Sequence, residues 1–151
     1  MAEYDYKEAM KLENQLCFPL YAAARHVVNL YVPWLKPLGL TYTQYIVLLV
    51  LWEKDGLTVG RICERLMLDS GTLTPLLKKL QSAGYVEKRR NENDEREVVI
   101  TLTESGRELQ SRAAHIPASV GGCLNLNSGK ASELYGLLYE LLENETNKKE
   151  I

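Results

Sequence analysis

Between residues 68 and 85 the apolar positions follow a helical period. One face is marked by leucines at i, i+3, i+4 and i+7, namely Leu73, Leu76, Leu77 and Leu80. The opposite face carries short hydroxyls first and cations later: Ser70, Thr72, Thr74, Lys78 and Lys79. Asp69 or Ser70 suits the N-cap, and Gly84 suits the end of the helix. Pro75 fits only a first turn, so either the helix begins later or one backbone hydrogen bond is lost near its start.

Other stretches upstream have the same period. A helical apolar face extends from Leu20 to Tyr31, and prolines 33 and 37 with Gly39 then predict a turn with at most a short helix. The apolar run 45–52 has the composition of a buried strand, but a capping-box signature at Thr41 and Gln44, and Gly56 beyond it, favour a buried helix. Thr58 opens a further short helix that ends near Leu66.

Downstream of Gly84 the period changes to that of strands. The β-branched runs 85–89 and 97–102 predict a hairpin whose charged tip is the loop 90–96. Thr103 caps a helix to about Ala114, which Pro117 and the glycine pair 121–122 are expected to interrupt. A last amphipathic helix begins at Ser128.

This order of elements is typical of a winged helix-turn-helix, in which the second helix enters the major groove of DNA and the hairpin tip reaches the adjacent groove. The predicted fold is mainly α with a small β hairpin. The DNA-binding unit spans about residues 41–102. The flanking apolar helices, about 8–32 and 103–146, have no partner inside so small a unit, which predicts that they form a dimerisation region.

Charge is distributed unevenly along the 151 residues. The net charge is -2, but residues 78–90 are basic and residues 133–145 are acidic, so a local basic patch is compatible with nucleic acid. No signal peptide is visible and the longest apolar run is too short for a bilayer, which predicts a cytoplasmic protein without a membrane partner. In that compartment the three cysteines are expected to be reduced. They are too widely spaced to indicate a zinc site, and no cofactor is expected.

Candidate DNA contacts lie on the presented helix and the hairpin. A run of charged residues most often forms a solvated face. Here the run lies on and beside the presented helix, which favours phosphate contact by Lys78, Lys79, Lys88, Arg89 and Arg90. Arg96 at the hairpin tip can enter a narrow minor groove, and the nearby carboxylate of Asp94 can hold its guanidinium in place.

Cys17 is the candidate for thiol chemistry. Pro19 favours the first helical position, which would place Cys17 at or just before a helix N-terminus, where the partial positive charge stabilises a thiolate. If the helix instead starts near Glu8, Pro19 kinks it and this argument weakens. By itself, a cysteine near a proline is more often a small buried apolar residue. Cys63 lies on an apolar helix face and is assigned to the core.

The sequence resembles the MarR family of regulators over nearly its whole length. The resemblance is carried by LDSGTLTPLLKKLQSAGYVEKRRNENDEREVVITLTESG, and LENQLCFPLYAAARHVVNLYVPWLKPLGLTYTQYIVLLVLWE is similar to the organic-hydroperoxide-sensing OhrR type. Residues 1–151 then form a single MarR-like domain. The resemblance implies a homodimeric repressor that binds double-stranded DNA at a pseudo-palindromic operator when reduced.

The same resemblance implies roles for individual residues. Cys17 matches the reactive cysteine that an organic hydroperoxide oxidises to a sulfenic acid, which a thiol then converts to a disulfide. Tyr31 and Tyr42 match tyrosines that hydrogen-bond its sulfur from the partner subunit. Cys123 lies about where some members carry a second cysteine that forms an intersubunit disulfide; if Cys123 is out of reach, a small thiol must resolve the oxidised Cys17. The family pattern also places its wing Asp and Arg at Asp94 and Arg96.

Two other functions are compatible with the sequence. One is a MarR-type regulator that binds a phenolic or other small ligand in the dimer crevice, with Cys17 incidental. The other is a thiol peroxidase, for which no second active-site motif is visible. The favoured interpretation has no catalytic residues and is a transcriptional repressor.

Overall fold

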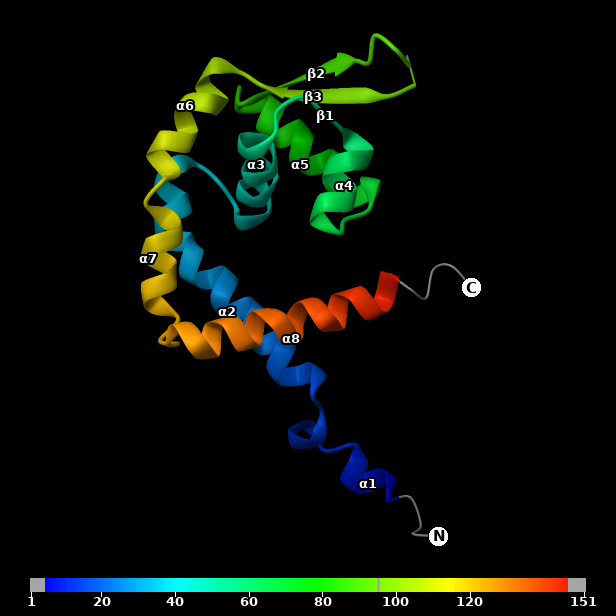
Figure 1. Cartoon of the computed structure of the whole chain (residues 1–151), viewed down its shortest axis with the longest axis vertical. Coiled ribbons are helices and arrows are strands. Elements are labelled where there is room, and N and C mark those ends of the chain that lie inside the picture. Colours follow the sequence, from blue (N-terminus) through cyan, green and yellow to red (C-terminus); the bar gives the residue numbers. More distant parts are fainter. Residues whose placement is uncertain (1–4, 95, 147–151) are drawn as a thin grey trace.

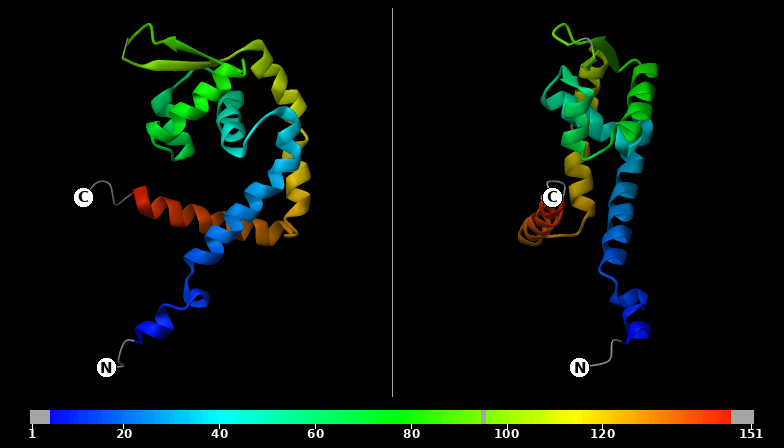
Figure 2. Two further views of the ribbon diagram at one scale, coloured as in Figure 1. Left: turned by 180° about the vertical axis from the view of Figure 1, so that it is seen from behind. Right: turned by 90° about the vertical axis from the view of Figure 1, so that its right-hand side faces the viewer.

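The computed structural model describes residues 5–94 and 96–146, arranged as a winged-helix unit from which long helices extend (Figure 1). Two short segments, α1 (Tyr6–Ala9) and η1 (Leu12–Asn14), precede the long helix α2 (Cys17–Leu35). Helix α2 leads up to the winged-helix unit. From there α6 (Glu104–Ala113) and α7 (Ile116–Cys123) return downward, and α8 (Ser128–Thr146) runs off in another direction (Figure 2).

The core of the winged-helix unit forms around α3 (Tyr42–Glu53), a helix that is apolar on most sides. Its predicted capping box is confirmed: the Thr41 hydroxyl accepts from the Gln44 N–H, and the Gln44 side chain accepts from the Thr41 N–H at 2.9 Å. A buried cluster joins Leu48 and Leu51 of α3 to Ile62 and to apolar side chains further along the chain, including those of the sheet. Because α3 lies between the other elements, it is hydrophobic without a single apolar stripe.

Helices α4 (Val59–Leu66) and α5 (Ser70–Ser82) form the helix-turn-helix. The Thr58 hydroxyl accepts from the Arg61 N–H and caps α4, as the sequence predicts. Met67 ends α4 in the left-handed conformation, with φ of 52°, and the Leu68 N–H bonds to the Cys63 carbonyl. The tight turn 67–69 therefore redirects the chain into α5 within three residues.

The predicted hairpin is part of a three-stranded antiparallel sheet with the order β1-β3-β2. Strands β2 (Val86–Arg90) and β3 (Val98–Leu102) each start one residue later than predicted, and Val86 pairs with Leu102 in their register. The third strand, β1 (Leu57–Thr58), has only two residues and pairs with β3. Two residues are too few to show an alternating pattern, which explains why the sequence did not predict it.

Two predicted interruptions are wrong. Helix α2 continues through Pro33 to Leu35, and the break falls in the 3-10 segment η2 (Lys36–Leu38), which Gly39 ends with φ of 69°. Residues 116–123 form α7 despite Pro117 and the glycine pair. Pro117 occupies one of the first two positions of α7, where a backbone N–H has no acceptor within the helix. The missing N–H of Pro117 therefore costs no hydrogen bond, and Pro117 starts the helix instead of breaking it.

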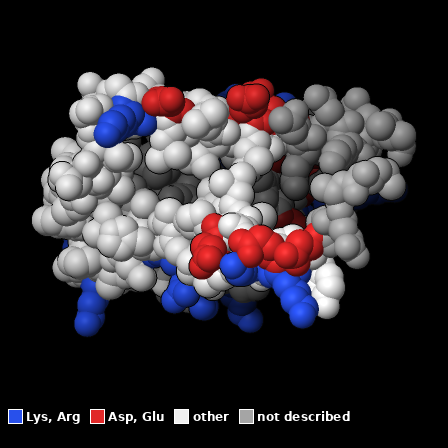
Figure 3. Space-filling model, turned by 90° about the horizontal axis from the view of Figure 1, so that it is seen from below, with Lys and Arg blue, Asp and Glu red and all other residues white. Residues whose placement is uncertain are grey.

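The helices outside the winged-helix unit leave apolar side chains at the surface. On α8 these include Leu134, Tyr135, Leu137, Leu141 and Leu142, which are 40–64% exposed. The end of the molecule formed by the long helices carries Lys, Arg, Asp and Glu only in small groups, and most of it is uncharged (Figure 3). Among the described helices, none is both long and apolar enough to cross a membrane.

Candidate nucleic-acid interface and thiol site

Helix α5 buries one face and exposes the other. Leu73, Leu77 and Leu80 are at most 1% exposed, and Leu76 is half-buried beside them. The Asp69 carboxylate is the N-cap and accepts from the Thr72 N–H at 2.8 Å, which settles the choice between Asp69 and Ser70. The predicted polar residues all lie on the exposed face: Ser70, Thr72, Thr74, Lys78 and Lys79.

Pro75 lies inside α5, which continues through it without a later start. Of the two sequence alternatives, the loss of one backbone bond near the helix start is therefore the one observed, because Pro75 has no N–H to donate to the Gly71 carbonyl. The buried leucines on both sides of Pro75 hold the helix against the core. The Pro75 side chain is exposed and becomes part of the outward face.

The wing is the loop at the end of β2 and β3, which extends away from the helices (Figure 1). Its turn is held locally: the Glu97 N–H bonds to the Asp94 carbonyl, and Asn91 Nδ2 donates to Glu97 Oε2 at 2.7 Å. Asp94 Oδ1 accepts from the backbone N–H of Arg96 at 3.0 Å. No ion pair joins the Asp94 and Arg96 side chains within the described residues, so Asp94 fixes the backbone at Arg96 and not the predicted guanidinium.

The cationic side chains near the wing differ in whether a carboxylate of the same chain pairs with them. Lys88, Arg89 and Arg90 are all exposed on β2, but Arg89 donates to Glu87 Oε2 at 3.1 Å. Lys88 and Arg90 make no ion pair among the described residues. Both are therefore better placed than Arg89 to contact a phosphate.

Two cations on α4 are engaged within the protein. Arg65 bonds to Glu53 of α3 at 2.6 Å, and this hydrogen bond with the attraction between the charges lowers the pKa of Glu53 and raises that of Arg65. Arg61 pairs with Glu64 at 2.8 Å. Helix α4 is thus joined to α3 by an ion pair, and its two arginines offer little free positive charge.

Cys17 is the first residue of α2, and its side chain is exposed. The predicted placement at a helix N-terminus is confirmed, although Pro19 takes the third helical position and not the first. The alternative of one continuous helix from Glu8 is excluded, because α1 ends at Ala9 and a separate 3-10 turn follows. The structure therefore places an accessible thiol at the start of a long helix, whose first turn has the Phe18 N–H bonded to the Gln15 carbonyl and no N–H at Pro19.

Tyr31 and Tyr42 lie together where α2 meets the start of α3. Their ring centroids are 4.8 Å apart with planes tilted by 57°, and Tyr45 lies 5.8 Å from Tyr31. Burial, and to a lesser extent the neighbouring Tyr31, raises the pKa of Tyr42. The Tyr42 hydroxyl is therefore a protonated hydrogen-bond donor well beyond neutral pH.

The structure does not bring Cys17 to these tyrosines within one chain. Cys17 and Tyr31 are 14 residues apart on the same helix, which corresponds to about 21 Å along its axis. Nor is Cys17 bonded to Cys123, since both are free. Cys123 is the last residue of α7, exposed, with its thiol donating to the Ser119 carbonyl at 3.3 Å. Any contact of Cys17 with Tyr31, Tyr42 or Cys123 must therefore involve a second chain or a rearrangement.

Cys63 differs from the other two cysteines. It lies on α4 and is partly buried against the core cluster, as predicted. It provides a matched thiol that lies away from the α2 terminus.

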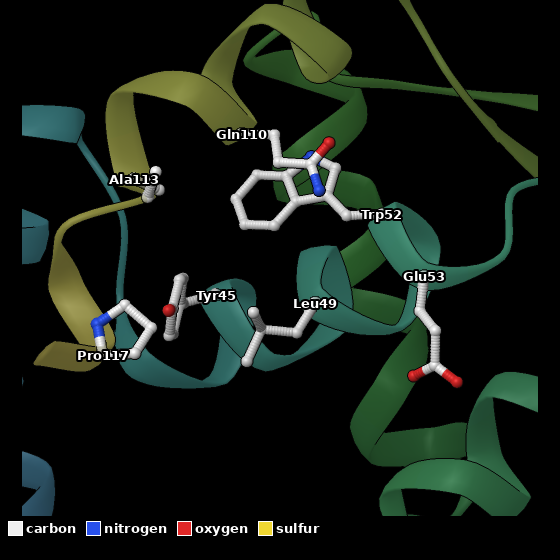
Figure 4. A pocket seen from close by; sticks show the side chains of 8 residues that line it. Tyr45, Leu49, Trp52, Glu53, Gln110, Ala113 and Pro117 are labelled. Carbon is white, nitrogen blue, oxygen red and sulfur yellow. The ribbon is translucent and has the colours of Figure 1, made fainter.

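A cavity of about 310 Å³ lies between α3 and the α6–α7 segment (Figure 4). Tyr45, Leu49 and Trp52 line it from α3, and Ala113 and Pro117 line the other side. Gln110 and Trp52 both line the hollow, while Glu53 points away from it. No pattern in the sequence predicted this site. Aromatic residues at i and i+7 on one helix were the available signal, but they are equally typical of a core.

The fold, the exposed polar face of α5 and the wing define the class of protein: a winged helix-turn-helix transcriptional regulator. The sequence model of the family described as transcriptional regulator SarA/Rot matches residues 29–112. The organic hydroperoxide resistance transcriptional regulator of Bacillus subtilis (strain 168) is 48% identical over 134 residues, which cover 89% of this chain and 91% of the relative. The chain belongs to the MarR family of transcriptional regulators, in the group that includes the organic hydroperoxide resistance regulators.

Solved structures agree with this assignment. Reduced AbfR bound to DNA matches with a TM-score of 0.76 and 37% identity, covering 92% of this chain and 96% of that one. AbfR, a protein of Staphylococcus epidermidis, in its disulfide form gives a TM-score of 0.60 at 36% identity, with 97% of both chains covered. The matched relatives are regulators and not enzymes. The overoxidised, DNA-bound form of AbfR gives a TM-score of 0.74, so this chain is similar to both DNA-bound forms.

Proposed function

We propose that this chain is a homodimeric, cytoplasmic repressor that binds a pseudo-palindromic operator when reduced and releases it when an organic hydroperoxide oxidises Cys17. The observation that carries the proposal is the exposed thiol of Cys17 at the N-terminus of α2, in a chain 48% identical to an organic hydroperoxide resistance regulator. The similarity to AbfR, whose structures include a reduced form bound to DNA and a disulfide form, supports the same assignment.

The chemistry begins with the thiolate of Cys17. Its sulfur attacks the distal oxygen of the hydroperoxide, the O–O bond breaks, and the alkoxide takes a proton and leaves as an alcohol. Cys17 is then a sulfenic acid, oxidised by two electrons. A second thiol attacks that sulfur, a disulfide forms, and water leaves. Cys123 of the partner subunit is one candidate for the second thiol, and a small thiol is the other.

The tyrosines are proposed to act across the dimer. Because Tyr31 lies about 21 Å along α2 from Cys17 of its own chain, the Tyr31 and Tyr42 hydroxyls can bond only to the sulfur of a partner's cysteine. The raised pKa of Tyr42 supports this role, since a neutral phenol donates a hydrogen bond to a thiolate. Oxidation would remove the negative charge that this bond stabilises.

The long helices are proposed to form the dimer. The exposed leucines and tyrosines of α8 need an apolar partner, and residues 5–94 and 96–146 of the same chain leave them exposed. We assign about residues 8–32 and 103–146 to dimerisation and about 41–102 to DNA binding, within one domain. The α5 helices of the two subunits would then reach successive major grooves, about 34 Å apart. A relative rotation of the two units changes this spacing and releases the operator.

The contacts with DNA follow from exposure. Ser70, Thr72, Thr74, Lys78 and Lys79 of α5 would face the major groove and its phosphates, with Lys88, Arg89 and Arg90 along β2. Arg96 would enter the minor groove from a turn that Asp94 holds.

The test compares three cysteine variants in a gel shift with and without cumene hydroperoxide. Cys17→Ser should bind DNA and fail to release it, whereas Cys63→Ser, the matched control, should bind and release like the wild type. Release of the Cys17→Ser variant by peroxide would overturn the proposal. Cys123→Ser separates the two second thiols: a crosslinked dimer on a non-reducing gel that disappears in this variant assigns the role to Cys123.

The cavity beside Tyr45 and Trp52 favours a second candidate function. Its apolar lining with Gln110 at one side would suit a phenolic or other small aromatic ligand, and the chain would then be a ligand-responsive regulator. In that case Cys17→Ser would keep its full response to the effector, while a bulky substitution such as Ala113→Phe would abolish it.

A further inference from the structure

We propose that α5 reads the amino groups of adenine and cytosine through two hydroxyls that can only accept hydrogen bonds, and that Asp69 is the positioning residue that sets this polarity. The inference rests on the proposed DNA-binding function and specifies which base edges the recognition face takes. It concerns Thr72 and Thr74, the two threonines in the first turns of α5.

The proton of the Thr72 hydroxyl is already engaged in a hydrogen bond within the protein. Thr72 Oγ1 donates to Asp69 Oδ2 at 2.9 Å, while the Thr72 N–H donates to Asp69 Oδ1 at 2.8 Å. These two hydrogen bonds also lower the pKa of Asp69, so its carboxylate is ionised and can only accept. The pair is bidentate, which fixes the Thr72 rotamer as well as its proton.

The Thr74 hydroxyl is held in the same state by the backbone. Thr74 Oγ1 donates to the Ser70 carbonyl at 2.7 Å, and a carbonyl oxygen can only accept. Both threonines are exposed. Each hydroxyl therefore retains two lone pairs and no proton for an outside partner.

The positions of these hydroxyls suit a base edge. On a helix, residues 72 and 74 flank the centre of the face opposite Leu73, and that centre is occupied by Gly71 and Pro75. Gly71 has no side chain and Pro75 has a short, rigid ring, so the helix surface between the hydroxyls is low on the Pro75 side, while Asp69 Oδ1 lies 3.0 Å from the place a Cβ would take on Gly71. A base edge can approach closely there, and the threonine methyls and the proline ring offer apolar contact.

The polarity determines which bases fit. In the major groove the donors are the N6 amino group of adenine and the N4 amino group of cytosine, whereas guanine presents only N7 and O6 acceptors. A guanine edge opposite an acceptor-only hydroxyl leaves both acceptors without a partner. An amino group satisfies the hydroxyl, and a thymine methyl next to it meets the apolar atoms.

The variant Asp69→Asn inverts the polarity of Thr72 and leaves the helix cap in place. Asparagine caps as well as aspartate, and its Oδ1 can still accept from the Thr72 N–H. Its Nδ2 would then donate to Thr72 Oγ1, which frees the hydroxyl proton to donate toward DNA. Thr72→Val removes the hydroxyl and keeps the shape, which makes it the matched loss-of-contact variant.

The experiment uses a duplex that the full-length wild-type protein enriches from a randomised DNA library. Single bases of each half-site are then replaced by purine for adenine or pyrimidin-2-one for cytosine, which delete one amino group, and by 2-aminopurine, which moves the amino group to the minor groove. Dissociation constants are measured by fluorescence anisotropy at one fixed salt concentration.

At one position the wild type should lose about fivefold in affinity when the amino group is deleted or moved, which is the effect of one hydrogen bond. Thr72→Val should be insensitive to deletion at that position. For each protein, the affinity for a duplex with guanine at that position is divided by its affinity for the unmodified duplex. This ratio should be about fivefold higher for Asp69→Asn than for the wild type. Insensitivity of the wild type to every amino deletion, or an unchanged guanine preference in Asp69→Asn, would overturn the inference alone. Failure of the wild type to enrich any sequence would overturn the proposed function itself.

Discussion

Asp55 connects three parts of the winged-helix unit through one carboxylate. Its Oδ1 accepts from the N–H groups of Gly56 and Leu102, each at 2.8 Å, and its Oδ2 accepts from Arg107 of α6 at 3.1 Å. In the register of β1 and β3, position 55 faces Leu102, two pairs beyond the end of the two-residue strand. The carboxylate therefore replaces the missing backbone partner at the edge of β3.

The magnitude of its contribution follows from these contacts. Replacing Asp55 with Ala leaves the N–H of Leu102, a residue that is 6% exposed, without its acceptor, at a cost of about 1–3 kcal/mol. The Arg107 and Asp55 side chains are 59% and 33% exposed, so the loss of their ion pair adds at most about 1 kcal/mol. Asp55→Asn keeps an oxygen acceptor for both N–H groups and should lose about 1 kcal/mol or less.

Urea unfolding followed by circular dichroism, at one protein concentration, measures these differences while holding dimer linkage constant. Arg107→Gln is the matched control for the ion pair and should resemble Asp55→Asn. The reasoning is refuted if Asp55→Ala is as stable as the wild type, or if Asp55→Asn is as destabilised as Asp55→Ala. Either result would mean that the Leu102 N–H does not depend on this carboxylate.

Three further outcomes are expected. Arg96→Ala should lose about 1–3 kcal/mol of operator binding in gel shifts at physiological salt, and Lys79→Gln should lower the salt slope by about one; tight binding by the first or an unchanged slope in the second would contradict these contacts. Because folding raises the pKa of Tyr42, the neutral phenol stabilises the fold below the ordinary tyrosine pKa, and this stability is lost as the pH rises through the pKa of the folded state. Tyr42→Phe should remove the corresponding late step from an ultraviolet titration of the tyrosines, and an unaltered titration would contradict the raised pKa. Gly106→Ala should destabilise by about 1–3 kcal/mol in thermal unfolding, since its Cβ would come within 2.1 Å of the Tyr85 carbonyl oxygen; wild-type stability would show that the backbone can yield.

Helix starts were predictable because the capping signal is local. Thr41, Asp69 and Thr103 each accept from an N–H of the first turn, as their sequence context indicates. Pro33 misled the prediction for the opposite reason. It removes one hydrogen bond of α2, which is a local loss, but burial of neighbouring side chains such as Leu35 outweighs it.

The candidate site was predictable only in part. The polar face of α5 followed from its period, because side chains three and four residues apart share a face. The proximity of Tyr31 to Tyr42 depends on how α2 packs against α3, and no local pattern encodes that contact. The proposed contact of Cys17 requires a second chain and came only from the family resemblance. The Asp69–Thr72 pair depends on the rotamer of one side chain, which the residue types alone do not determine.

The contacts of α3 indicate how a change at a sulfur would reach the DNA-binding face. Tyr42, beside Tyr31, is the first residue of α3, whereas Trp52 near its end donates to the Gly106 carbonyl at 2.8 Å and Glu53 pairs with Arg65 of α4. Its middle is buried in the core and close-packed, so α3 transmits displacement instead of absorbing it. We therefore expect a shift of Tyr42 to move α4, α5 and the wing together. The recognition face would keep its internal geometry, and the change in affinity would come from the distance between its two copies in the dimer.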